Sequence, residues 1–200
     1  YPDAEHGLIP GPAQSATHQL EYKASVGLEG GGPVMWWGGV IPDQQPMDND
    51  SLVYETEPLE APLEILGFPG AMLSVSSDAT RANWVARISD VSPQGQVTQV
   101  SGAGFNGTHR ESSREPTDLI PGQNFKLDIE MQFTSWVFPK GHRIRLAISN
   151  SQWPMLWPTP YPMTSKLELG GTDGTRITLP VVEAAKGPAP VFKALAGDPV

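Results

Sequence analysis

The chain has 200 residues with 21 Gly, 21 Pro and no Cys, and its formal net charge is −9 at pH 7. Gly and Pro are costly inside helices and common in turns, so a helical bundle or a doubly wound α/β domain is disfavoured and many short strands are favoured. The acidic charge argues against binding to nucleic acid or to an anionic membrane, because both depend on clustered Lys and Arg.

The segment boundaries follow from changes in composition along the chain. Residues 1–18 mix Pro and Gly with polar residues and predict a linker or arm, residues 19–182 alternate as strands do, and residues 183–200 predict a tail. Tyr1 is not an initiator Met, so we expect a segment upstream. No apolar run approaches the roughly 20 residues needed to cross a bilayer, and we expect a soluble chain. Its compartment stays open between bacterial cytoplasm and periplasm or secretion.

We expect eight or nine strands. In the clearest, residues 124–133, the side chains of Phe125 to Phe133 at odd positions face the core. A hairpin is predicted around the turn Ser92-Pro93-Gln94-Gly95, and Arg143 and Arg145 are expected to face outward from a strand over 143–149. The other candidate segments are 20–25, 52–55, 63–66, 71–77, 84–91, 96–101, 165–169 and 175–182.

Motifs for catalysis, cofactors and metals are weak in this chain. No G-x-S-x-G elbow occurs, and the four His residues are far apart, so no catalytic residue is assigned. Gly102 to Gly107 spells G-x-G-x-x-G, but its flanks have strand composition, which predicts a chance match and no cofactor. Asp48-Asn49-Asp50 departs from the EF-hand pattern, so we expect a solvated acidic loop and no metal; a calcium loop of another kind is the alternative.

Six Trp residues form the most informative pattern. Trp84 and Trp136 fall in or beside strands and are predicted to be core. Trp36 and Trp37 lie among glycines, and Trp153 with Trp157 lies in a proline-bounded loop, so both pairs are expected at an exposed apolar surface. A domain contact and a carbohydrate platform would use the same residues.

Ten ordered pieces of the sequence, spread over residues 20–182, resemble the C-terminal domain of the CocE/NonD hydrolase family, which also closes X-Pro dipeptidyl-peptidases of the PepX type. The pieces are residues 43–44, 52–59, 63–67, 73–78, 86–95, 110–111, 121–122, 134–138, 141–146 and 148–154. The resemblance implies an all-β, jelly-roll β-sandwich of galactose-binding-like fold, joined to an α/β-hydrolase domain that carries the Ser-His-Asp triad. This chain would then be a non-catalytic accessory domain of a dipeptidyl-peptidase, acylase or esterase.

The same resemblance implies the partners and the site. The partners are the α/β-hydrolase domain of the same parent chain, a small ester, amide or peptide substrate, and further copies in a homo-oligomer. Met35, Trp36 and Trp37, which follow Gly31-Gly32, would line the substrate pocket or domain interface together with Trp153 and Trp157, and Gly141-His142-Arg143 would be structural. The alternatives are a free-standing carbohydrate-binding module that uses the loop Trp residues and a purely structural oligomerisation sandwich.

Overall fold

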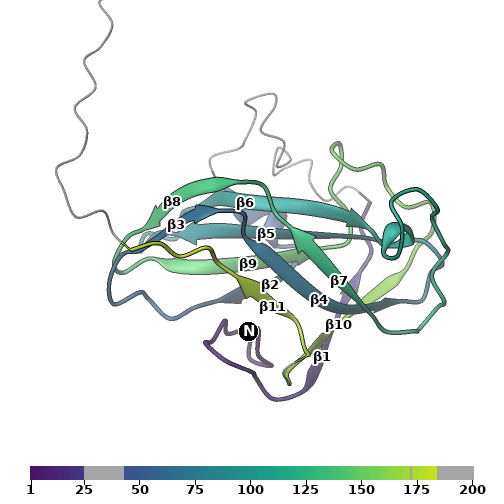
Figure 1. The fold of residues 1–200 in the computed structure, drawn as a ribbon, viewed down its shortest axis with the longest axis horizontal. Coiled ribbons are helices and arrows are strands. Elements are labelled where there is room, and N and C mark those ends of the chain that lie inside the picture. Colours follow the sequence, from purple (N-terminus) through teal and green to yellow (C-terminus); the bar gives the residue numbers. More distant parts are fainter. Residues whose placement is uncertain (25–42, 172, 184–200) are drawn as a thin grey trace, which may run out of the picture.

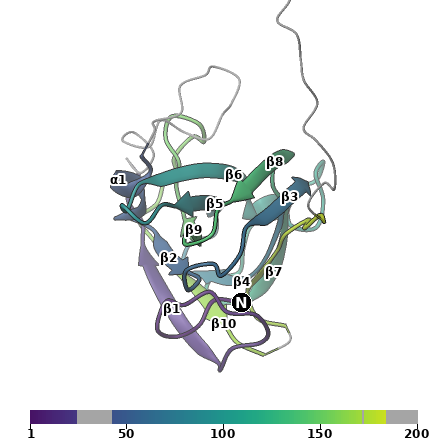
Figure 2. The same ribbon diagram turned by 90° about the vertical axis from the view of Figure 1, so that its left-hand side faces the viewer.

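The computed structural model describes residues 1–24, 43–171 and 173–183, and these residues form an antiparallel β-sandwich (Figures 1 and 2). One sheet has the order β1-β10-β4-β11, with β7 also paired to β4, and the other has the order β2-β9-β5-β6. A two-stranded ribbon pairs β3 with β8. The all-β antiparallel sandwich is therefore confirmed, while the jelly-roll and galactose-binding-like assignment stays a prediction.

The element bounds place most strands close to the predicted segments, but β1 begins within the residues predicted as an arm, and β8 lies where no strand was predicted. The first sheet contains β1 (Ala16–Glu21), β4 (Gly70–Ser77), β7 (Phe125–Glu130), β10 (Thr164–Leu169) and β11 (Arg176–Thr178). The second contains β2 (Leu52–Glu55), β5 (Asn83–Val91), β6 (Val97–Asn106) and β9 (Arg143–Ser149), and the ribbon contains β3 (Leu63–Gly67) and β8 (Thr134–Phe138). Two short helices, α1 (Gln45–Asp48) and the 3-10 turn η2 (Gly107–His109), complete the described part.

The core lies between the two sheets because strand alternation turns one apolar face of each sheet inward. On β9, Leu146 pairs with Tyr54 of β2 and Ile88 of β5, so one buried row crosses the second sheet. Trp84 is buried as predicted, and its ring meets Phe125 of the first sheet edge-on, with centroids 5.3 Å apart. Large inward side chains on both sheets thus hold the layers together.

The predicted strand over 124–133 is only partly correct. Strand β7 ends at Glu130, and one further hydrogen bond in the same register follows it, from the amide of Met131 to the carbonyl oxygen of Pro69. The chain then crosses to pair with β3, so Phe133 is 57% exposed and stacks edge-on against Phe68. The expectation that Phe133 faces the core is therefore wrong.

The predicted hairpin is confirmed. Strands β5 and β6 pair antiparallel, and the amide of Gly95 donates to the carbonyl oxygen of Ser92 at 2.8 Å. Gly95 has φ +89°, a left-handed conformation that glycine adopts without strain. Most of the G-x-G-x-x-G sequence lies within β6, and its last glycine begins η2. A strand in this place offers no long helix N-terminus for a dinucleotide pyrophosphate.

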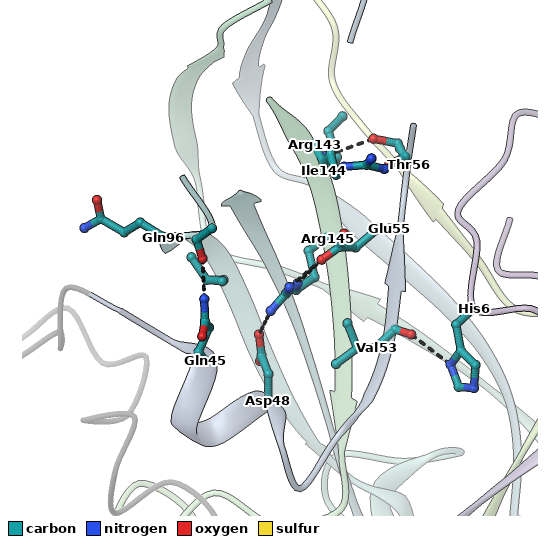
Figure 3. Close-up of polar contacts among 12 residues, drawn as sticks. His6, Gln45, Asp48, Val53, Glu55, Thr56, Gln96, Arg143, Ile144 and Arg145 are labelled. Carbon is teal, nitrogen blue, oxygen red and sulfur yellow. Dashed lines mark hydrogen bonds and ion pairs between the residues drawn. The ribbon is translucent and has the colours of Figure 1, made fainter. Parts of the chain in front are cut away.

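The outer face of the second sheet carries a buried ion network under α1, which corrects the prediction of a solvated loop at Asp48 (Figure 3). Asp48 is a buried residue of α1 and not part of a solvated loop. Its Oδ1 accepts from Arg87 Nη2 at 2.8 Å and its Oδ2 from Arg145 Nη1 at 2.7 Å. Arg145 also donates through Nε to Glu55 Oε1 at 2.7 Å, so it is held in a network and does not extend freely into solvent.

The network keeps two guanidinium groups charged inside the fold. Burial lowers the pKa of Arg87, and the carboxylate of Asp48 opposes this by attraction and hydrogen bonding. Burial also disfavours charge on Arg145, but hydrogen bonds and the charges of Asp48 and Glu55 outweigh it and raise its pKa. One carboxylate therefore serves two cations, and α1 is fixed to β5 and β9 through it.

Candidate functional site

The structure brings two of the five predicted site residues together. Trp153 and Trp157 lie in the loop between β9 and β10, where their rings meet edge-on with centroids 5.2 Å apart and an interplanar angle of 78°. Trp157 is 79% exposed and Trp153 is half-buried. Met35, Trp36 and Trp37 lie outside the described residues.

This β9–β10 loop is anchored to the chain that leads out of β1. Three hydrogen bonds make the connection: Asn150 Nδ2 to the Leu20 carbonyl oxygen (3.2 Å), Ser151 Oγ to the Lys23 carbonyl oxygen (2.6 Å), and Tyr22 Oη to the Thr159 carbonyl oxygen (2.9 Å). The described chain therefore reaches residue 24 directly beside the loop that carries Trp153 and Trp157.

The loop also packs on β6 through a glycine. A side chain at Gly104 would collide with Leu156, so the absence of a Cβ lets the loop lie against the strand. Within the loop, the amide of Leu156 donates to the carbonyl oxygen of Gln152 at 2.8 Å. The exposed indole of Trp157 is thus presented by a supported loop, and Gly104 of the G-x-G-x-x-G sequence has a packing role.

A groove of about 420 Å³ lies beside Trp157 at this end of the sandwich. Figure 1 shows the β9–β10 loop in light green at the same end as the coiled 3-10 turn. The polar and aromatic side chains that line the groove are Arg81, Asn83, Asn106, Thr108, His109, Asp118, Trp157 and Thr159. These residues come from β5, β6, η2 and three loops, so only the folded chain assembles the groove.

The groove carries groups suited to binding. Asn83 Nδ2 donates to the Trp157 carbonyl oxygen at 3.4 Å, and Arg81 Nε pairs with Asp118 Oδ1 at 3.2 Å on the exposed rim. The buried hydroxyl of Thr159 makes no hydrogen bond within the described part of the chain. An apolar indole beside amides, a hydroxyl and an ion pair can contact a partner loop or a small polar ligand.

His142 and Arg143 make hydrogen bonds that connect neighbouring strands. His142 Nδ1 donates to Asp90 Oδ1 at 2.8 Å, and the other oxygen of Asp90 accepts from Trp136 Nε1 at 3.1 Å. Arg143 Nη1 donates to the Thr56 carbonyl oxygen at 2.8 Å. These bonds join β5, β8, β9 and the segment after β2, which is the structural role expected for Gly141-His142-Arg143.

Sequence reasoning found the loop but not the groove. Prolines around Trp153 and Trp157 indicated an exposed aromatic loop, whereas nothing in the local pattern marked Asn83, Asn106 or Asp118 as its neighbours. No group of three or more His, Cys, Asp or Glu side chains among the described residues is arranged to hold a metal ion. Over the same residues, no helix is both long and apolar enough to cross a bilayer.

Comparison with known proteins assigns the domain. The model of the X-Pro dipeptidyl-peptidase C-terminal non-catalytic domain family matches residues 10–186. The chain belongs to this family. The predicted resemblance to the C-terminal domain of CocE/NonD hydrolases is thereby confirmed, and the match includes every strand of both sheets.

Related proteins share this domain within longer chains. Cocaine esterase of Rhodococcus sp. (strain MB1 Bresler) is 36% identical over 114 residues, which are 56% of this chain and 20% of the esterase. An α-amino acid ester hydrolase structure has a TM-score of 0.80 at 24% identity and covers 91% of this chain and 36% of its own. A CocE/NonD family hydrolase from Staphylococcus aureus has a TM-score of 0.67 at 15% identity, covering 91% and 36%. This C-terminal domain therefore spans about a third or less of the proteins it matches.

Proposed function

We propose that this domain is the accessory part of a CocE/NonD-type serine hydrolase and packs on an α/β-hydrolase domain of the same parent chain. The parent would act on small esters, amides or X-Pro peptides through an acyl-enzyme whose triad lies outside these 200 residues. The observation that carries the proposal is the family match over residues 10–186, combined with relatives that are much longer than this chain.

The contact would be made by the surface around Trp153 and Trp157, and this surface would form one wall of the substrate pocket. An exposed indole supported by a hydrogen-bonded loop is a strong anchor, because Trp buries a large area at little cost in conformational freedom. The groove beside Trp157 supplies polar groups from Asn83 and Thr159 around that anchor. Apolar centres ringed by polar groups are typical of specific interfaces.

A free-standing carbohydrate-binding module is the second candidate. The same exposed Trp157 and the amides of Asn83 and Asn106 favour it, since sugars are held by an aromatic face and by hydrogen bonds. The length of the relatives favours the accessory role, because in them the matched region accounts for only 20% to 36% of the protein.

A serine-directed activity probe distinguishes the two functions. We expect a fluorophosphonate probe to label the full-length protein that contains this chain, and we expect the 200-residue chain alone to remain unlabelled and to hydrolyse no p-nitrophenyl ester. The control is full-length protein blocked beforehand with an unlabelled serine inhibitor. Absence of labelling in the folded full-length protein would refute the hydrolase assignment, and glycan binding that depends on Trp157 would then support the module.

A further inference from the structure

The first nine residues form an arm that lies before the family match, which begins at residue 10, and yet is docked on the sandwich. The amide of Leu8 donates to the Glu55 carbonyl oxygen at 2.6 Å, and the amide of Glu55 donates to the His6 carbonyl oxygen at 3.1 Å. Leu8 is buried in the core cluster. The arm therefore covers the outer edge of β2, a strand whose other edge pairs with β9.

Two stacked histidines fix this arm to β1 and β2. The rings of His6 and His18 stack with centroids 4.4 Å apart, and both stack on Tyr54. His6 Nδ1 donates to the Val53 carbonyl oxygen at 3.0 Å (Figure 3), and His18 Nδ1 lies 2.8 Å from Tyr54 Oη. Burial raises the pKa of the Tyr54 hydroxyl, so the hydroxyl remains protonated and donates to a neutral His18.

The surroundings disfavour a positive charge on His18. From the arm it faces His6 and Asp3; from β2 it faces Tyr54; and on β10 its partner in the register is the apolar Leu167. Burial lowers the pKa of His18, and His6 lowers it further, while the backbone of Ala4 and the charge of Asp3 act in the opposite direction. The Asp3 carboxylate is itself engaged, because it accepts from the amides of Gly7 and Glu5.

We propose that residues 1–9 form a pH-dependent latch, docked on β2 while His18 is neutral and released when His18 takes up a proton. Protonation leaves His18 Nδ1 without a lone pair, so the Tyr54 hydroxyl must turn from donating to accepting, and it places a positive charge against the stacked ring of His6. If the proposed function holds, the latch also sets how the accessory domain is tethered to a preceding hydrolase domain; the latch itself does not depend on that function.

The direction of the pH effect follows from linkage. With the arm docked, the pKa of His18 lies below its ordinary value because of burial and the neighbouring His6, and release of the arm removes His6 and part of that burial. The released state therefore binds the proton more tightly, and docking weakens as the pH falls. Uptake of one proton changes the opening constant by at most about tenfold per pH unit.

Residue-resolved hydrogen exchange tests the latch. We expect the opening constant of the Leu8 amide, corrected for the intrinsic rate, to rise between pH 7 and pH 5 by a factor that stays below the roughly hundredfold limit for one proton over two pH units, while that of Ile88 in the central strand β5 stays unchanged. The ring proton of His18, followed by NMR over the same range, should titrate with the midpoint of this opening. A Leu8 opening constant that is flat with pH, or that changes only together with Ile88, would overturn the proposal.

A pair of variants separates His18 from general acid effects. His18→Phe keeps a flat ring against Tyr54 but takes up no proton, so we expect the pH dependence at Leu8 to disappear. His109→Phe, on η2 and outside the arm, should retain the wild-type dependence. Unchanged pH dependence in His18→Phe would contradict the latch. If that variant does not fold, the wild-type protein decides: a His18 titration midpoint that matches the midpoint of Leu8 opening supports the latch, and a mismatch contradicts it. Serine-probe labelling is independent of these readouts, so failure of the proposed function is recognised separately.

Discussion

Replacing Asp48 by Asn is expected to lower the free energy of unfolding by about 3–5 kcal/mol, the usual cost of removing one partner from a buried ion pair. Asp48 pairs with Arg87, whose side chain is fully buried, and with Arg145, whose side chain is 15% exposed. The amide of Asn cannot neutralise either guanidinium, so two cations would remain under α1, and among the described residues Glu55 would be the one carboxylate left in the network. The loss should appear in urea unfolding followed by Trp fluorescence.

The neighbouring carboxylate provides a matched control. Asp50 lies two residues after Asp48 and pairs with Lys23, whose side chain is 58% exposed. Asp50→Asn therefore removes the same charge, but from an ion pair that solvent screens. We expect this variant to lose less than about 1 kcal/mol. Equal and small losses for both variants would show that the buried network does not hold α1 to the sheet.

Replacing Trp157 by Ala in the full-length protein is expected to lower kcat/KM for its ester or peptide substrate by about 30-fold or more. This is the effect of losing an interface anchor of about 2 kcal/mol or more. Because Trp157 is largely exposed in this chain, the substitution should change the unfolding free energy of the isolated domain by less than about 0.5 kcal/mol. Steady-state kinetics and urea unfolding measure the two effects separately.

Phe133 is the control for this substitution. It is another exposed aromatic, but it lies between β7 and β8 and contacts Phe68, away from the β9–β10 loop. Phe133→Ala should leave kcat/KM within about twofold of the wild type. If Trp157→Ala also retained full activity, the β9–β10 loop would not form a wall of the substrate pocket.

The fold could be predicted from sequence where local alternation coincides with burial. Strand β9 is an example, because Ile144, Leu146 and Ile148 are buried at the predicted positions. The same alternation could not show that the outward face of β9 is covered by α1. Asp48 was therefore expected in a solvated loop, although it meets the outward-facing Arg145 across 97 residues of sequence.

The end of β7 shows a second limit. Alternation continues through Phe133, but the chain leaves the first sheet at Glu130 to pair with β3. Which strand offers a partner edge is a property of the tertiary structure, and period-two patterning does not contain it. The groove beside Trp157 has the same origin, because Asn83 and Asp118 reach it only through the packing of distant loops.

Hydrogen exchange of the β9–β10 loop, compared between the full-length protein and this chain alone, tests the accessory-domain proposal most directly. If the surface around Trp153 and Trp157 packs on a hydrolase domain, the amides of residues 153, 155–157 and 159 should exchange at least about tenfold more slowly in the full-length protein. The amides of residues 133–135, away from the loop, should be unchanged. Equal exchange rates for residues 153, 155–157 and 159 in the two proteins would contradict docking through this surface.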